Sequence, residues 1–133
     1  MAAVELSEAD ARQRLADYAD RLSIGAVNSP TSVVLSGEAQ ALEEMLQSVE
    51  GEGTIFRRLY VDYALHSSQM ERFREPLIRE LQGLRPGRAS IPLFSTVTGH
   101  KSSGEEYDAE YWGRNMCQEV NYKIPCRSFL TIL

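Results

Sequence analysis

The sequence predicts an α+β fold, and three observations point to it. Two stretches, residues 7–20 and 36–51, carry apolar side chains at the spacing of an amphipathic helix. Two short runs rich in Ile and Val, residues 22–27 and 31–35, have the composition of strands. The chain has 133 residues, of which 43% are hydrophobic and 25% charged, which is typical of one soluble globular domain with a single packed core.

The first predicted helix covers residues 7–20. Ser7-Glu8-Ala9-Asp10 has the form of a capping box, which satisfies the free N–H groups of a first helical turn. The apolar stripe of this helix consists of Ala11, Leu15, Tyr18 and Leu22. Asn28-Ser29-Pro30 is typical of a turn, so the two strand-like runs on either side of it form a predicted hairpin.

The second predicted helix begins at Ser36-Gly37 and ends at Gly51-Glu52-Gly53. Its apolar residues, spaced i, i+3, i+4 and i+7, are Leu42, Met45, Leu46 and Val49. An extended run, residues 54–61, follows it, and residues 2–6 form another predicted strand. Residues 1–61 therefore have the order strand, helix, strand, strand, helix, strand, which is typical of a ferredoxin-like βαββαβ unit.

The pattern changes after this unit. A third amphipathic helix is predicted from Met70 to Leu84, kinked or restarted at Pro76. Residues 91–98 alternate partly as a strand, residues 99–104 read as a polar turn, and a short helix capped by Asp108 is expected over 108–116. These elements are too few to enclose a hydrophobic core of their own. They therefore either dock on the first unit or belong to a larger domain.

Charge and composition exclude several classes of partner. The net charge of −5 and the pI near 5.1 argue against binding to nucleic acid, which needs clustered Lys and Arg. The sequence has neither a basic flank leading into an apolar leader nor a run of about 18 apolar residues, so we expect a cytoplasmic protein without a membrane partner. Cys117 and Cys126 form no CxxC pair and have no nearby His, which predicts two buried free thiols and no metal site.

Three segments, taken in order, carry a family resemblance. They are Ala26-Val27-Asn28-Ser29-Pro30 with Ser32-Val33-Val34-Leu35-Ser36-Gly37, then Val61-Asp62-Tyr63-Ala64-Leu65-His66-Ser67, then Phe94-Ser95-Thr96-Val97-Thr98-Gly99 with Tyr111-Trp112-Gly113-Arg114-Asn115. Over about residues 1–122 the chain resembles the acyltransferase domains of modular, type I polyketide synthases, a family similar to malonyl-CoA:acyl carrier protein transacylases. From Ile124 the resemblance is no longer recognisable, which indicates a truncated or altered terminus.

The resemblance implies both an architecture and an activity. Residues 1–61 would be the ferredoxin-like small subdomain, and residues 62–133 a partial C-terminal portion of an α/β-hydrolase-like large subdomain. In this family a serine in a G-H-S-x-G segment takes malonyl or methylmalonyl from CoA and passes it to the phosphopantetheine arm of an acyl carrier protein by a ping-pong mechanism, without a bound cofactor. The matching position makes His66 the catalytic base of this cytoplasmic transferase.

The serine segment has no counterpart in the chain. Residues 99–104 resemble it only superficially, because Lys101 separates His100 from Ser102 and neither serine there has the flanking glycines. We therefore expect the isolated chain to be inactive and to act with the remainder of a polyketide synthase. The alternative is a stand-alone ferredoxin-like module that binds a carrier protein or a small ligand without catalysis.

Two further sets of residues acquire roles from the resemblance. A catalytic imidazole must be held in one tautomer, and the family's orienting backbone carbonyl lies in a segment whose matching position is Asn115. Tyr63, Ala64 and Leu65 fall on the motif that distinguishes malonyl-selecting from methylmalonyl-selecting domains. Tyr63 resembles the methylmalonyl type, whereas the bulk of Leu65 favours malonyl, the substrate we expect.

Overall fold

The computed structural model describes residues 1–122. Cys126 and the segment from Ile124, for which an altered terminus was predicted, lie outside the described residues. Within the part of the chain that the structure describes, no helix is both long and apolar enough to cross a membrane.

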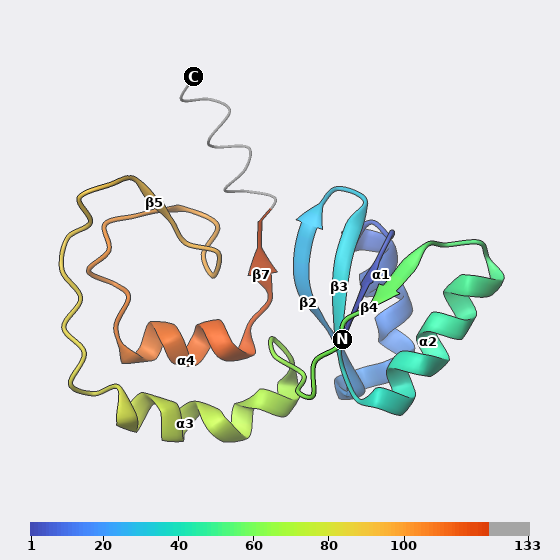
Figure 1. Ribbon diagram of the computed structural model, residues 1–133, viewed down its shortest axis with the longest axis horizontal. Coiled ribbons are helices and arrows are strands. Elements are labelled where there is room, and N and C mark those ends of the chain that lie inside the picture. Colours follow the sequence, from blue (N-terminus) through green and yellow to red (C-terminus); the bar gives the residue numbers. More distant parts are fainter. Residues whose placement is uncertain (123–133) are drawn as a thin grey trace.

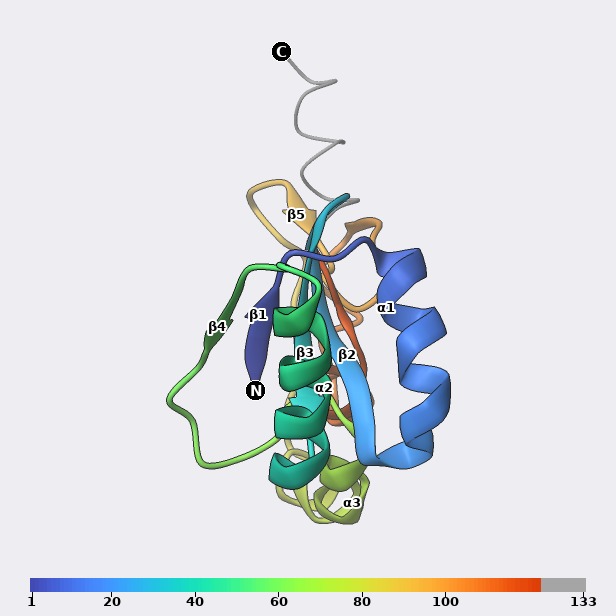
Figure 2. The same cartoon turned by 90° about the vertical axis from the view of Figure 1, so that its right-hand side faces the viewer.

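The predicted order of elements in residues 1–61 is present. It comprises β1 (Ala2–Val4), α1 (Glu8–Leu15) continued by a 3₁₀ turn η1 (Ala16–Arg21), β2 (Leu22–Ser29), β3 (Ser32–Gly37), α2 (Ala39–Gly51) and β4 (Phe56–Arg58). The strands form an antiparallel sheet in the order β4-β1-β3-β2. Helices α1 and α2 lie on the same face of this sheet (Figure 2).

A single apolar core lies between these helices and the sheet. Its largest fully buried side chains are Leu35, Met45, Leu46, Val4, Val27, Val33 and Val49. The predicted cap is confirmed, since the backbone N–H of Asp10 donates to the hydroxyl of Ser7 at 3.1 Å. Strands β1 and β4 are shorter than predicted. The chain turns after β1, where the backbone N–H of Leu6 donates to the carbonyl oxygen of Val4 at 3.0 Å. Near β4, Ile55 and Tyr60 are exposed and bury no side chain that would favour a longer edge strand.

The remaining elements lie beside the first unit (Figure 1). They are η2 (Ser68–Met70), α3 (Glu71–Glu80), β5 (Leu93–Phe94), β6 (Lys101–Ser102), α4 (Ala109–Cys117) and β7 (Val120–Asn121). Helix α3 runs without a break through Pro76 and ends before the predicted Leu84. The cap predicted for α4 is confirmed, since Asp108 accepts from the backbone N–H of Tyr111 at 2.9 Å.

The prediction for residues 91–104 is wrong in detail. The strand is confined to β5, and the expected polar turn contains β6, which pairs with β5 in an antiparallel hairpin. The cause is Ser95, whose buried hydroxyl accepts from the backbone N–H groups of Val97 and Thr98 and turns the chain before a longer strand can form.

The C-terminal elements dock on the first unit, which was one of the two expected arrangements. Strand β7 runs parallel to β2, with Val120 opposite Ala26, and extends the sheet to five strands. Val120 also packs with Ala26 and Val34 on the face of the sheet away from α1 and α2. This pairing brings the end of α4 to the sheet beside the loop that contains His66.

Candidate active site

The segment 59–67 connects β4 to η2, and the predicted base lies in its last part, the loop 64–67. His66 has φ of 61°, a left-handed conformation that non-glycine residues seldom adopt, although His tolerates it better than most. Such a conformation persists only when the surrounding structure holds it in place, and it is concentrated at functional sites. The loop 64–67 is held by hydrogen bonds from β3, from within the loop and to the end of α4.

Two buried serine hydroxyls hold the loop. Ser36, on β3, donates to the carbonyl oxygen of Leu65 at 2.6 Å and is fully buried. Ser67 donates back to the carbonyl oxygen of Ala64 at 2.7 Å and is 1% exposed. Both carbonyls are thus satisfied by side chains, since the loop belongs to no helix or strand that could do so.

The end of α4 holds His66 itself. The backbone N–H of His66 donates to the carbonyl oxygen of Met116 at 2.9 Å. Its ring atom Nδ1 lies 3.0 Å from the carbonyl oxygen of Gln118. Because a carbonyl oxygen can only accept, Nδ1 carries the proton, and in the neutral imidazole Nε2 is left with a free lone pair. This is the tautomer that a general base requires.

The expected orienting position, Asn115, needs correction. The carbonyl that accepts from the imidazole belongs to Gln118, three residues later. Asn115 lies within the last turn of α4, where carbonyls are directed along the helix axis, whereas Gln118 has φ −90° and ψ 156° and leaves the helix. Its carbonyl is therefore free to turn toward His66.

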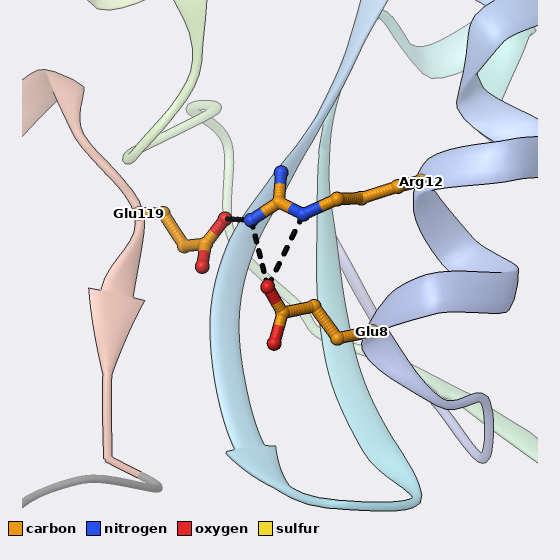
Figure 3. A network of polar contacts seen from close by, with 3 residues as sticks. All are labelled: Glu8, Arg12 and Glu119. Atoms are coloured by element: carbon orange, nitrogen blue, oxygen red, sulfur yellow. Dashed lines mark hydrogen bonds and ion pairs between the residues drawn. The ribbon is translucent and has the colours of Figure 1, made fainter.

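His66 lines a cavity of about 550 Å³ between the first unit and the end of α4. Its lining residues are Arg12, Leu15, Ala16, Ala19, Asp20, Leu22, Ser23, Ile24, His66, Cys117 and Glu119. Two residues of this lining, Arg12 and Glu119, form a charged network with Glu8 (Figure 3). Arg12 on α1 contacts Glu8 at 3.1 Å and Glu119, which follows Gln118, at 2.7 Å.

The charges in this network and the neighbouring thiol have altered proton affinities. Partial burial alone would lower the pKa of Arg12, but the carboxylates of Glu119 and Glu8 raise it above its usual value. Burial raises the pKa of the Cys117 thiol, an effect increased by Glu71, so the predicted free thiol is present and protonated. Within residues 1–122, no group of three or more His, Cys, Asp or Glu side chains could hold a metal ion.

The three residues expected to select the substrate do not share the cavity of His66. Tyr63 and Ala64 line a second cavity of about 650 Å³, together with Val61 and Phe73 among others. Tyr63 is 59% exposed, and Leu65 is half-buried with its carbonyl oxygen bound by Ser36. The loop thus presents Tyr63 and His66 to different cavities of the described chain.

Sequence reasoning missed the residues that position His66. Gln118 acts through its backbone, for which no side-chain signal exists. Ser36 and Ser67 were inside the segments that carry the family resemblance, but nothing in the sequence indicated that their hydroxyls bind carbonyls of the His66 loop.

Comparison with known protein families and sequences identifies relatives along the whole chain. The family described as the acyl transferase domain matches residues 1–129. Polyketide synthase GfsB of Streptomyces halstedii is 43% identical over 131 residues, covering 98% of this chain and 2% of that protein. Erythronolide synthase EryA2 of Saccharopolyspora erythraea is 45% identical over 122 residues, covering 92% of this chain and 3% of that protein. The chain thus spans a small part of each.

Solved structures agree with this assignment. The acyltransferase domain from module 8 of the salinomycin polyketide synthase superposes with a TM-score of 0.95 at 37% identity, covering 98% of this chain and 31% of that one. A loading acyltransferase from the avermectin modular polyketide synthase gives a TM-score of 0.94 at 30% identity, covering 98% of this chain and 42% of that one. The chain therefore belongs to the acyl transferase domain family, in the branch found in modular polyketide synthases.

Proposed function

We propose that this chain is part of a polyketide synthase acyltransferase domain in which His66 is the general base. The domain would transfer malonyl or a substituted malonyl group from CoA to the phosphopantetheine arm of an acyl carrier protein. One observation carries this proposal. Nδ1 of His66 is held by a backbone carbonyl at 3.0 Å, in a strained loop, which leaves Nε2 able to accept a proton.

The chemistry follows from that free lone pair. Nε2 takes the proton of the serine hydroxyl as the serine oxygen attacks the thioester carbonyl, and the C–S bond to CoA then breaks. The imidazolium returns its proton to the leaving CoA thiolate. In the second half-reaction Nε2 takes the proton of the carrier-protein thiol, which attacks the acyl-serine ester, and the proton passes to the departing serine oxygen. The serine belongs to the family's G-H-S-x-G segment, a sequence that the 133 residues do not contain.

The Gln118 carbonyl supports the charged intermediate as well as the neutral base. When His66 becomes an imidazolium, its Nδ1–H donates a charge-assisted hydrogen bond, which is stronger than the bond of the neutral ring. No carboxylate is needed for this function. Asn115 would contribute only by setting the geometry of the turn that follows it.

The finer assignments rest on the same family. We propose that residues 1–61 are a ferredoxin-like small subdomain, supported by the strand order β4-β1-β3-β2, and that residues 62–133 belong to a large α/β-hydrolase-like subdomain. The protein would act in the cytoplasm. Tyr63, Ala64 and Leu65 would tune selectivity, with Leu65 favouring malonyl over methylmalonyl. One methyl group discriminates by only about 1–3 kcal/mol, so competition between the two acyl-CoAs is the appropriate measurement.

The test is reconstitution. The chain, alone or joined to the G-H-S-x-G segment of a related acyltransferase domain, is incubated with malonyl-CoA and a phosphopantetheinylated carrier protein, and malonylation is followed by intact-protein mass spectrometry. We expect transfer only by the joined protein. Transfer at the same rate by the chain alone would place the nucleophile within these 133 residues and overturn the proposal.

A further inference from the structure

We propose that Ser36 is a positioning residue for His66: its buried hydroxyl fixes the peptide unit that sets the left-handed conformation of the base. The two polar atoms of the Leu65–His66 peptide are held from opposite sides. Its carbonyl oxygen accepts from Ser36 at 2.6 Å, and its N–H donates to Met116 at 2.9 Å. The orientation of this peptide plane determines φ of His66, which is 61°.

The sheet is shaped to bring Ser36 to this peptide. Ser36 lies on β3 directly opposite Ser23 of β2, and the pairing of the two strands shifts register between Ile24 and Ala26. Gly25 occupies this irregularity. A Cβ there would lie 3.1 Å from Cβ of Ser36 and 3.6 Å from the carbonyl oxygen of Leu65, so any larger residue would crowd the hydrogen bond.

The arrangement couples the core of the first unit to the base. Ser36 is fully buried and its neighbour Leu35 is part of the central core, so the hydroxyl is a rigid donor. On the other side, Met116 lies in the last turn of α4 and Gln118 directly follows that helix. The loop between them has no backbone ladder of its own, so losing the Ser36 donor leaves the Leu65 carbonyl without a partner and favours opening of the loop.

The role of Ser36 in catalysis rests on the proposed function of His66, but the positioning itself can be measured without any transfer reaction. The chain contains only two histidines, His66 and His100, and His100 is exposed. Uniformly ¹⁵N-labelled protein therefore gives two resolvable imidazoles. Their ring ¹⁵N shifts report the tautomer, and backbone amide hydrogen exchange at His66 reports how often the loop opens.

Three variants make the test specific. Ser36→Ala removes the hydrogen-bond donor. Ser36→Cys keeps a side chain of similar size, but its thiol is a much weaker donor than a hydroxyl. Ser102→Ala is the matched control, because Ser102 is also buried but its hydroxyl accepts from the backbone N–H of Gly104, two residues later, and not from the His66 loop. If Ser36→Ala does not fold, Ser36→Cys carries the test.

We expect Ser36→Ala and Ser36→Cys to lower the amide protection factor of His66 by about two- to tenfold more than that of amides in α2, and to move its ring from a single Nδ1–H tautomer to a mixture. Ser102→Ala should leave both signals of His66 unchanged. Equal loss of protection at His66 and in α2, with the tautomer retained, would overturn the inference. Failure of the proposed transfer activity would leave these NMR results unaffected, so the two can be told apart.

Discussion

Replacing His66 by glycine should give a more stable protein than replacing it by alanine. Both variants lose the hydrogen bond from Nδ1 to the Gln118 carbonyl, worth about 1 kcal/mol, so that loss cancels in the comparison. Alanine keeps the left-handed backbone cost of about 1–2 kcal/mol, which glycine does not bear. Glycine loses about 0.5–1 kcal/mol more chain entropy on folding. The difference between these two terms favours His66→Gly over His66→Ala by about 0–1.5 kcal/mol, with a central value of about 0.75 kcal/mol.

Urea unfolding followed by far-UV circular dichroism measures this difference, provided that the m-values of the two variants agree. The matched control is Gln47, an exposed position in the middle of α2, where Gln47→Gly should be less stable than Gln47→Ala by about 1 kcal/mol. The sign must therefore reverse between the two sites. A His66→Gly variant less stable than His66→Ala would refute the claim that the backbone of His66 is held in a strained conformation.

Three other changes have defined outcomes. Gly37→Ala should destabilise the protein by more than about 2 kcal/mol in urea unfolding, because Gly37 has φ 154° and a Cβ there would overlap a neighbouring backbone carbonyl. Hydrogen bonds from Ser102 and from the backbone lower the pKa of Glu106 from 4.5 to about 2. The ionised Glu106 therefore stabilises the folded protein fully above pH 4.5, and this stabilisation is lost as the pH falls through about 2. Glu106→Gln should therefore flatten the thermal stability profile between these pH values, and an unchanged slope would contradict this origin. In a Cys126→Ser background, iodoacetamide should alkylate Cys117 at least about tenfold more slowly in the folded chain than in the urea-unfolded chain, because burial raises the pKa of the thiol. Equal alkylation rates in the two states would contradict the burial of Cys117.

Local sequence signals were sufficient for the order of elements in the first unit, but not for all of their bounds. Ser36-Gly37, predicted to begin the second helix, end β3 instead, and α2 begins at Ala39. The hydrophobic periods of residues 7–20 and 36–51, with the turn at Asn28-Ser29-Pro30, predicted the helices and the hairpin that the structure contains. The pattern is clearest for α2, which buries a continuous apolar face against the sheet, whereas α1 buries only Ala11 fully and packs Leu15 partly against the same core. Residues 91–98 misled the prediction because a buried serine hydroxyl, invisible to hydrophobic periodicity, competes with strand pairing.

The candidate site was predictable only in part. The family resemblance selected His66, but the groups that hold it are two backbone carbonyls at the end of α4 and a hydroxyl on β3. A carbonyl has no sequence signature, since every residue carries one, and its direction depends on where the helix ends. The displacement of the orienting group from Asn115 to Gln118 follows from that end point.

The most direct test of the central claim is to compare His66→Gln with His100→Gln in the protein joined to a G-H-S-x-G segment, by the single-turnover rate of carrier-protein malonylation. His100 is exposed, and within residues 1–122 it forms hydrogen bonds through its backbone N–H and carbonyl, so it is the matched control. We predict that His66→Gln lowers the rate by about 10²–10⁴-fold, whereas His100→Gln leaves it unchanged. A His66→Gln variant as fast as His100→Gln would show that His66 is not the base.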